Sequence, residues 1–192
     1  MSYVISEPTL CMVVGVPGSG KTTIAQGLCT QLRDSSYASK DMVQSAFTYE
    51  RIDGSTYAMI SLPTLKFLAE YARTQLFLGK TPIVDGPFSI NEWRGDATKD
   101  WVQYFVEAAG DSRLAIVRLF PPDREEQKRR FLLRNRANID SWTSKNWETF
   151  CEREPIDFPI RHDDVYQIVS ETEKTEQIVN KILQDYLQAQ NI

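Results

Sequence analysis

A glycine-rich segment at residues 15–22, GVPGSGKT, directly follows the apolar run LCMVV at residues 10–14. Its spacing is G-x-x-x-x-G-K-T, the pattern of a phosphate-binding P-loop. Glycines allow a tight turn that aims successive backbone N–H groups at phosphate oxygens, and the lysine adds a positive charge beside them. The threonine hydroxyl can ligate Mg²⁺. The segment therefore predicts a strand, a phosphate-binding loop and a helix, in this order.

The residues after the loop support this interpretation. Ile24, Leu28 and Leu32 recur at helical spacing, and the N-terminus of such a helix would direct the positive end of its dipole at bound phosphates. The alternative is a glycine-rich turn that binds nothing, which the complete motif between a strand and a helix disfavours. We expect the nucleotide to be bound by Gly15, Pro17, Gly18, Ser19, Gly20, Lys21, Thr22 and Thr23. Lys21 is also expected to act in catalysis.

Length and composition indicate a single domain spanning residues 1–192. With 42% hydrophobic and 25% charged residues, the composition is typical of a soluble globular protein. The formal net charge of −4 excludes the overall basic surface expected of a protein that coats nucleic acid. Cys11, Cys29 and Cys151 are odd in number and too widely spaced for a disulfide framework or a zinc site. Without a signal-peptide pattern or a stretch of about 18 apolar residues, we expect a cytoplasmic protein that does not contact membranes.

Short apolar runs alternate with helical patterns along the chain. Strands are expected at residues 10–14, 35–41, 81–85, 113–120 and 165–169. Strands that alternate with helices indicate a parallel, doubly wound α/β sheet with helices on both of its faces.

Several helix boundaries can be predicted from individual residues. Pro63 suits the first turn of a helix that Gly79 ends. Asp123 has capping-box spacing to a glutamate at the start of a strongly basic helix, and Ser170 has the same spacing at the start of the last helix. We therefore expect Ser170 to serve as a helix cap.

Two aspartates are expected at strand ends, and ligands of such sheets bind beyond the carboxyl ends of the strands. Asp85 follows the run PIV, as in a Walker B strand, where a carboxylate can hold Mg²⁺ directly or through water. Its alternative role is to start a turn before Gly86 and Pro87. Asp41 would lie one strand over, where phosphoryl transfer to an alcohol needs a group that orients the hydroxyl and accepts its proton. Because Asp41 and Gln44 have capping-box spacing, its alternative role is a helix cap.

The basic run KRRFLLRNR carries a third candidate group. Arg130 and Arg134 are four residues apart and share a helical face, so their guanidinium groups could reach over a bound triphosphate. Cations at that place stabilise the charge that spreads over the phosphoryl oxygens in the transition state. The alternative is a solvated basic helix face. With a P-loop in the same chain, we favour a lid with Arg130 and Arg134 as catalytic and nucleotide-binding residues.

Together these residues resemble the P-loop kinases that include polynucleotide 5′-hydroxyl kinase, the zeta toxins and chloramphenicol phosphotransferase. The resemblance implies that Asp41 in SSYASKDMVQ activates the acceptor hydroxyl. It also implies that Asp85 and Arg94 in IVDGPFSINEWR, and the lid arginines Arg130 and Arg134, belong to the site. It further implies a three-layer α/β/α domain with a five-stranded parallel sheet in the order 2-3-1-4-5 and a lid near residues 122–142.

The resemblance places the acceptor between residues 42–60 and 86–101. The aromatic residues of these segments are Phe47, Tyr49, Tyr57, Phe88, Trp93 and Trp101. They could stack on an acceptor, but packing in the core is the commoner role of scattered aromatics. One departure concerns Gln44, because polynucleotide kinases of this pattern carry an arginine at that position. A polynucleotide acceptor is therefore disfavoured.

These observations predict an ATP-dependent phosphotransferase that uses Mg²⁺, held by Thr22 and Asp85, to phosphorylate a hydroxyl of a small-molecule or nucleotide-like acceptor. The resemblance favours ATP over GTP, and the sequence has no N-K-x-D guanine motif. The alternatives are a polynucleotide 5′-hydroxyl kinase or another nucleic-acid kinase, and an ATPase or nucleotide-dependent switch. The sequence leaves the acceptor and the oligomeric state open.

Overall fold

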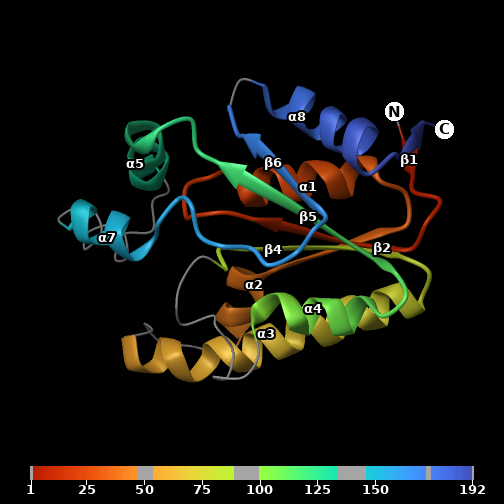
Figure 1. The fold of residues 1–192 in the computed structure, drawn as a ribbon, viewed down its shortest axis with the longest axis horizontal. Coiled ribbons are helices and arrows are strands. Elements are labelled where there is room, and N and C mark those ends of the chain that lie inside the picture. Colours follow the sequence, from red (N-terminus) through yellow and green to blue (C-terminus); the bar gives the residue numbers. More distant parts are fainter. Residues whose placement is uncertain (1, 47–53, 89–99, 134–145, 172–173, 192) are drawn as a thin grey trace.

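The computed structural model describes residues 2–46, 54–88, 100–133, 146–171 and 174–191, with only the backbone described at 54–60 and at Arg153. A five-stranded parallel sheet forms its centre (Figure 1). Its strands are β2 (Thr9–Val14), β3 (Ser35–Ser39), β4 (Thr81–Gly86), β5 (Arg113–Phe120) and β6 (Val165–Val169). Their order is β3-β4-β2-β5-β6. Numbered by themselves, these strands follow the predicted order 2-3-1-4-5, so the predicted fold class is confirmed.

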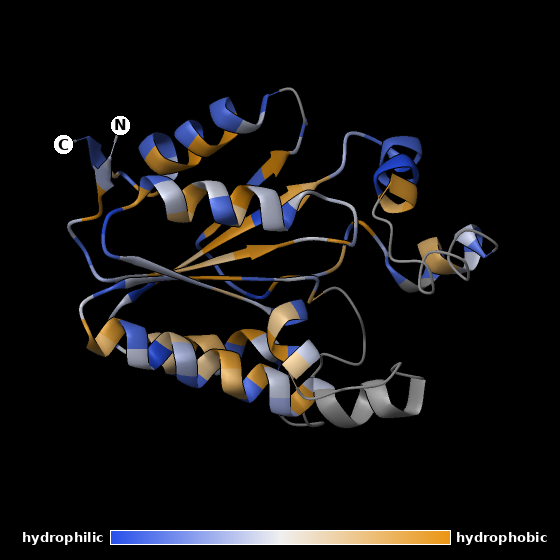
Figure 2. Ribbon diagram, turned by 180° about the vertical axis from the view of Figure 1, so that it is seen from behind, coloured by the Kyte–Doolittle hydropathy of each residue, from blue (hydrophilic) through white to orange (hydrophobic). Residues whose placement is uncertain are grey.

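Helices cover both faces of the sheet, which makes three layers (Figures 1 and 2). One face carries α1 (Lys21–Gln31), α8 (Thr175–Lys181) and the π-helical turn η3 (Ile182–Tyr186). The other carries α2 (Lys40–Ala46), α3 (Gly54–Phe77) and α4 (Trp101–Ala109). The short strands β1 (Tyr3–Val4) and β7 (Gln190–Asn191) pair antiparallel and bring the two ends of the chain together. No helix in the described part of the chain is long and apolar enough to cross a membrane.

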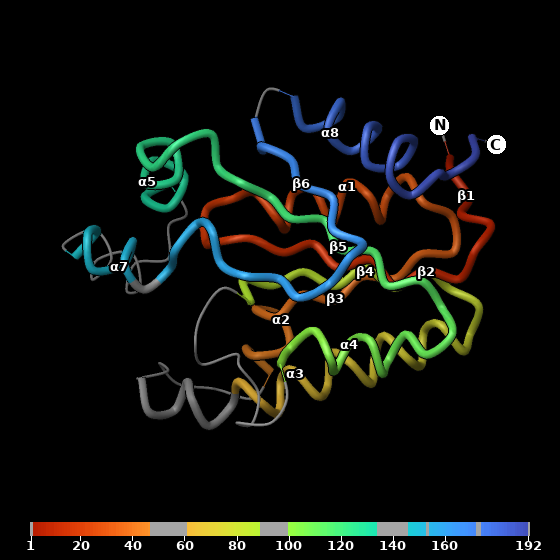
Figure 3. Tube along the Cα trace, viewed as in Figure 1, coloured from red at the N-terminus to blue at the C-terminus, as the bar shows by residue number. Residues whose placement is uncertain are grey.

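Two further helices, α5 (Arg124–Leu133) and α7 (Trp147–Arg153), lie beyond the end of the sheet toward which β5 runs (Figure 3). The predicted cap of α5 is confirmed, because the Asp123 carboxylate accepts a hydrogen bond of 2.7 Å from the backbone N–H of Glu126. Of the expected lid at residues 122–142, residues 134–142 lie outside the described residues.

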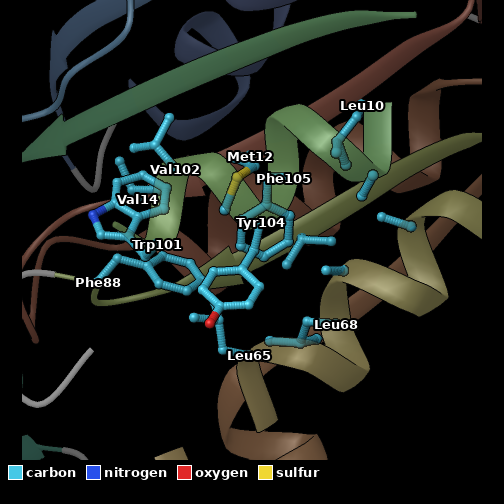
Figure 4. Close-up of a cluster of buried hydrophobic side chains, with 14 of the residues drawn as sticks. Leu10, Met12, Val14, Leu65, Leu68, Phe88, Trp101, Val102, Tyr104 and Phe105 are labelled. Atoms are coloured by element: carbon cyan, nitrogen blue, oxygen red, sulfur yellow. The ribbon is translucent and has the colours of Figure 1, made fainter. Parts of the chain in front are cut away.

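The central strand β2 is fully buried, and its alternate side chains enter two separate cores. Leu10, Met12 and Val14 pack with residues of α3 and α4, as Figure 4 shows. Cys11 and Val13 face α1, α8 and η3 on the other side. This burial on both faces explains why the strand is a continuous apolar run.

Two predicted boundaries are wrong. The strand expected at residues 35–41 ends at Ser39, because the Ser39 hydroxyl accepts a hydrogen bond of 3.0 Å from the N–H of Met42 and so caps α2. Asp41 therefore lies in the first turn of a helix and not at the end of a strand. Pro63 lies inside α3, which begins at Gly54. The long apolar face of α3 on the core offsets the backbone hydrogen bond that a proline removes.

Candidate nucleotide-binding and phosphoryl-transfer site

The P-loop connects β2 to α1 at the carboxyl end of the central strand, as the sequence predicts. Gly15, Gly18 and Gly20 have φ angles of 152°, 84° and 84°, in the region that side chains rarely adopt. A Cβ atom at Gly15 would lie 2.4 Å from the carbonyl oxygen of Leu119. Glycine is therefore required here both by the backbone conformation and by the close approach of β5.

Polar side chains line this turn. The Lys21 side chain is buried, and its Nζ donates a hydrogen bond of 3.0 Å to the carbonyl oxygen of Val16, across the loop. The Ser19 hydroxyl is also buried and has no hydrogen-bond partner among the described residues. It lies 2.7 Å from where a Cβ of Gly15 would stand, inside the turn. A buried ammonium and an unsatisfied hydroxyl in one tight loop fit a polyphosphate, whose oxygens can bind both.

Thr22 and Asp85, the predicted metal ligands, are in contact. The Thr22 hydroxyl donates a hydrogen bond of 2.7 Å to Oδ2 of Asp85 at the end of β4. Both groups are oxygen donors of the kind that Mg²⁺ prefers. Burial raises the pKa of Asp85, whereas the hydrogen bond from Thr22 and the nearby Lys21 charge lower it. A buried carboxylate with an incompletely compensated charge fits a site for a divalent cation.

Tyr37 on β3 also binds this carboxylate, and sequence reasoning missed it. Its hydroxyl donates a hydrogen bond of 3.1 Å to Oδ1 of Asp85. Burial and the Asp85 charge raise the pKa of Tyr37 well above its usual range, so the phenol stays protonated and acts as a donor. Its position two residues before Ser39, which is paired with Asp85, places it on the same sheet face. That pairing depends on the strand register, which a single strand sequence does not reveal.

Asp41 lies close to Asp85 but in a different environment. Ser39 pairs with Asp85 across β3 and β4, and Asp41 follows two residues later in α2. The side chain of Asp41 is 46% exposed, and the buried Nζ of Lys40 lies 3.7 Å from its Oδ1. Because Ser39 caps the helix, Asp41 is not the N-cap that the alternative interpretation required. Lys40, an ammonium beside the candidate base, was missed because the sequence pattern drew attention only to the aspartate.

Arg130 on α5 lies against the P-loop. Its Nη1 donates a hydrogen bond of 3.4 Å to the carbonyl oxygen of Gly18, and its Nε donates one of 2.8 Å to Glu126. Hydrogen bonds from Arg129 and Arg130 hold the pKa of Glu126 at about 2, so this carboxylate remains charged. Arg129 is largely exposed and has the solvated position expected for a basic face. Arg94 and Arg134 lie outside the described residues.

Two more side chains contact the loop, and sequence reasoning gave neither of them this role. The Gln127 Nε2 donates a hydrogen bond of 2.7 Å to the carbonyl oxygen of Pro17. The prediction that Ser170 caps the last helix is wrong, because α8 has Lys174 at its N-cap, and the Ser170 hydroxyl instead donates a hydrogen bond of 2.5 Å to the carbonyl oxygen of Ser19. Gln127 follows Glu126 in a polar helix, and no sequence signal distinguishes it from a solvated residue. The position of Ser170 directly after a strand of the sheet was a signal that could have been used.

The aromatic residues expected near the acceptor pack in the core wherever their side chains are described. Phe88 and Trp101 are stacked with ring centroids 4.8 Å apart, and Phe105 packs against both (Figure 4). Phe47, Tyr49 and Trp93 lie outside the described residues, as does the side chain of Tyr57. The packing interpretation is therefore correct for Phe88 and Trp101.

Comparison with known proteins agrees with this fold. The family model AAA_33, described as an AAA domain, matches residues 10–154. Among solved structures, a proposed kinase from Chloroflexus aurantiacus has a TM-score of 0.68 at 18% identity, covering 94% of this chain and 97% of its own. A sugar kinase from Janibacter sp. has a TM-score of 0.60 at 20% identity, covering 94% and 95% of the two chains.

Shikimate kinase from Acinetobacter baumannii, solved with shikimate, has a TM-score of 0.56 at 17% identity, covering 95% of this chain and 94% of its own. No curated protein matches the sequence significantly. The family match spans most of the chain and includes the P-loop, Asp41, Asp85 and α5. The chain therefore belongs to the AAA_33 family of AAA domains and has the fold of the P-loop kinases.

Proposed function

We propose that this protein transfers the γ-phosphoryl group of ATP to a hydroxyl of a small-molecule or nucleotide-like acceptor. The P-loop binds the phosphates through its backbone amides, and Lys21 places its charge at the β- and γ-phosphates. The ammonium then exchanges its bond to the Val16 carbonyl for phosphate oxygens. The P-loop amides and the Lys21 ammonium hold the triphosphate in position before transfer and neutralise its charge during transfer.

The observation that carries the proposal is the proximity of two carboxylates in different environments at the same edge of the sheet. Asp85 is buried and hydrogen bonded to Thr22, which suits a metal ligand. Asp41 is partly exposed one strand away, which suits a base that a second substrate can reach. A protein that only bound ATP would have no need of the second carboxylate.

Thr22 and Asp85 are the residues that would hold Mg²⁺, which supplies charge neutralisation at the phosphates. Tyr37 fixes one carboxylate oxygen of Asp85 through its hydroxyl and leaves Oδ2 directed toward Thr22. Asp41 orients the acceptor hydroxyl and accepts its proton as the oxygen attacks the γ-phosphorus, while the bond from that phosphorus to the bridging oxygen breaks and ADP leaves. Arg130, which hydrogen bonds to the P-loop, is placed to stabilise charge on the phosphoryl oxygens.

The likeness to sugar and shikimate kinases supports a small acceptor, since those proteins have the same fold at a similar length. Gln44 in α2 is uncharged and its side chain is buried. It therefore does not offer the exposed positive charge that the phosphates of a polynucleotide would need. We therefore favour sugars, cyclic polyols, nucleosides and related alcohols as acceptors.

The test is to incubate the purified protein with γ-labelled ATP and Mg²⁺ and to offer these alcohols in separate reactions. We expect at least one of these alcohols to become labelled, at a rate well above that of phosphate release in the absence of acceptor. Asp111→Asn, a change at an exposed residue remote from the P-loop, serves as the control for protein quality. Release of phosphate at the same rate with every alcohol, and no labelled product, would instead support an ATPase or switch.

A further inference from the structure

Four consecutive carbonyl oxygens of the P-loop each accept a hydrogen bond from a side chain. Lys21 Nζ donates to the carbonyl of Val16 at 3.0 Å, and Gln127 Nε2 donates to that of Pro17 at 2.7 Å. Arg130 Nη1 donates to the carbonyl of Gly18 at 3.4 Å, and Ser170 Oγ donates to that of Ser19 at 2.5 Å. The last three donors come from α5 and from the residue after β6, far from the loop in sequence. We call Gln127, Arg130 and Ser170 the outer clasp.

The members of the outer clasp are buried or nearly so and are tied to one another. The Ser170 hydroxyl accepts a hydrogen bond of 2.9 Å from Arg130 Nη1, and the Ser170 carbonyl accepts one of 2.6 Å from Nη2. Gln127 is completely buried, and its Oε1 accepts a hydrogen bond of 2.8 Å from Arg124. The Gln127 side chain is thereby fixed with its amide group donating to the loop. Such a network is rigid because each polar group has its partner in a buried environment.

The orientation of each carbonyl fixes that of the next backbone N–H, because the two groups of a trans peptide point in opposite directions. The carbonyl of Pro17 shares its peptide plane with the N–H of Gly18, and the carbonyl of Ser19 shares its plane with the N–H of Gly20. Both glycines have φ of 84°, and glycine peptides rotate more easily than others. Holding the two carbonyls against α5 and β6 therefore turns the two glycine N–H groups toward the inside of the loop.

We propose that Gln127 and Ser170 are positioning residues that hold the Gly18 and Gly20 peptides in the orientation that binds phosphate. This inference rests on the proposed function, since the phosphates are those of the bound ATP. Preorganised amides bind an anion more tightly because the protein does not have to order them on binding. Close packing supports the assignment, since a Cβ at Gly18 would lie 3.0 Å from Cγ of Gln127.

The experiment compares Ser170→Ala and Gln127→Met with the wild-type protein. Ser35→Ala is the matched control, because the Ser35 hydroxyl also donates to backbone carbonyls, at 2.9 Å, but at the opposite end of the sheet. Calorimetry gives the dissociation constants for ATP and for tripolyphosphate, which lacks the nucleoside. Hydrogen exchange of the P-loop amides is measured on the ligand-free proteins, and thermal melts monitor the fold.

We expect both dissociation constants to rise by the same factor, on the order of tenfold for each clasp variant. P-loop exchange should become faster in both variants but not in Ser35→Ala, while melting temperatures of Ser170→Ala and the control remain similar. Ser170→Ala removes only a hydroxyl, so the test holds even if the Gln127 variant is unstable.

Weaker binding of ATP with unchanged binding of tripolyphosphate would overturn the proposal, because the residues would then act on the nucleoside. Unchanged exchange of the P-loop amides would overturn it as well. Failure of the wild-type protein to bind either phosphate compound would contradict the proposed function instead. Faster exchange in the ligand-free variants would still show that the clasp orders the loop, so the two failures can be distinguished.

Discussion

Thr22 and Asp85 are joined by a hydrogen bond of 2.7 Å, which links the first turn of α1 to the carboxyl end of β4. The Thr22 hydroxyl occupies one oxygen of a carboxylate that is buried in the sheet and whose pKa is raised by that burial. Without a bound cation, the Thr22 hydroxyl stabilises the carboxylate by a neutral hydrogen bond and supplies no positive charge to balance it. A buried carboxylate is costly to keep charged without a nearby cation, which fits the metal site proposed above.

Asp85→Asn is expected to raise the melting temperature of the nucleotide-free protein at neutral pH and to abolish Mg²⁺-dependent transfer. A carboxyl with a raised pKa contributes stability below the ordinary aspartate pKa of about 4 and loses this contribution as the pH rises through the raised value. Asparagine removes that loss, so the gain in melting temperature should be present at pH 7 and shrink toward pH 4. Thermal melts across this range measure it.

Asp164→Asn is the control with the opposite sign. Burial would raise the pKa of Asp164, but hydrogen bonds from Arg113 to both carboxylate oxygens lower it below the usual range. Its charged form therefore adds stability above the ordinary pKa, and asparagine should lower the melting temperature at pH 7. If both substitutions changed the melting temperature equally and in the same direction, the conclusion that the charged Asp85 destabilises the cation-free protein would be contradicted.

The contrast between β5 and β3 shows what the sequence could predict about the fold. Residues 113–120 form a buried parallel strand whose apolar run has clear ends, and the prediction of its bounds is confirmed. At residues 35–41 the chain changes from strand to helix without a glycine or proline, and only the hydrogen bond to Ser39 shows where. A local side-chain cap of this kind competes with the strand pattern in the sequence.

Some residues of the candidate site could be predicted from the sequence and others could not. Motif spacing predicts the P-loop, and the apolar run before Asp85 predicts a carboxylate at a strand end, because each of these signals lies within one short segment. Tyr37, Gln127 and Ser170 come to the site through strand register and helix docking, and their side chains have no distinctive spacing. Such contacts between distant segments are set by the packing of the whole domain.

Lys21→Ala is expected to lower turnover by on the order of 10³-fold or more, because the ammonium neutralises charge that develops on the phosphates. The fold should persist, since the side chain hydrogen bonds to a loop carbonyl and lies outside the two cores. Steady-state kinetics and circular dichroism measure the two effects. Lys80→Ala, a change at an exposed lysine, is the matched control and should leave both unchanged. Near-normal turnover in a folded Lys21 variant would remove the P-loop lysine from the mechanism.

Asp41→Asn is expected to reduce transfer by on the order of 10²-fold with little change in ATP affinity, because it removes a base and not a nucleotide contact. Stability should change little, since Ser39 and not Asp41 caps α2 and the Asp41 side chain is nearly half exposed. Single-turnover rates and calorimetric titration with ATP separate the two quantities. A loss of ATP affinity at an unchanged maximal rate would instead assign Asp41 to the metal site.

The acceptor is expected to be a small alcohol in preference to a long polynucleotide. Each phosphate neutralised by a lysine or arginine adds salt-dependent affinity, and the chain has a net charge of −4. Gln44 is buried where polynucleotide kinases place an arginine, and Arg130 is already bonded to the P-loop and Ser170. Initial rates with 5′-hydroxyl DNA and RNA oligomers, measured beside sugars and nucleosides as salt is raised from low to physiological concentration, test this. Efficient labelling of the oligomers, with rates that fall steeply as salt rises, would establish the polynucleotide kinase alternative, whereas salt-insensitive labelling of a small alcohol is the expected result.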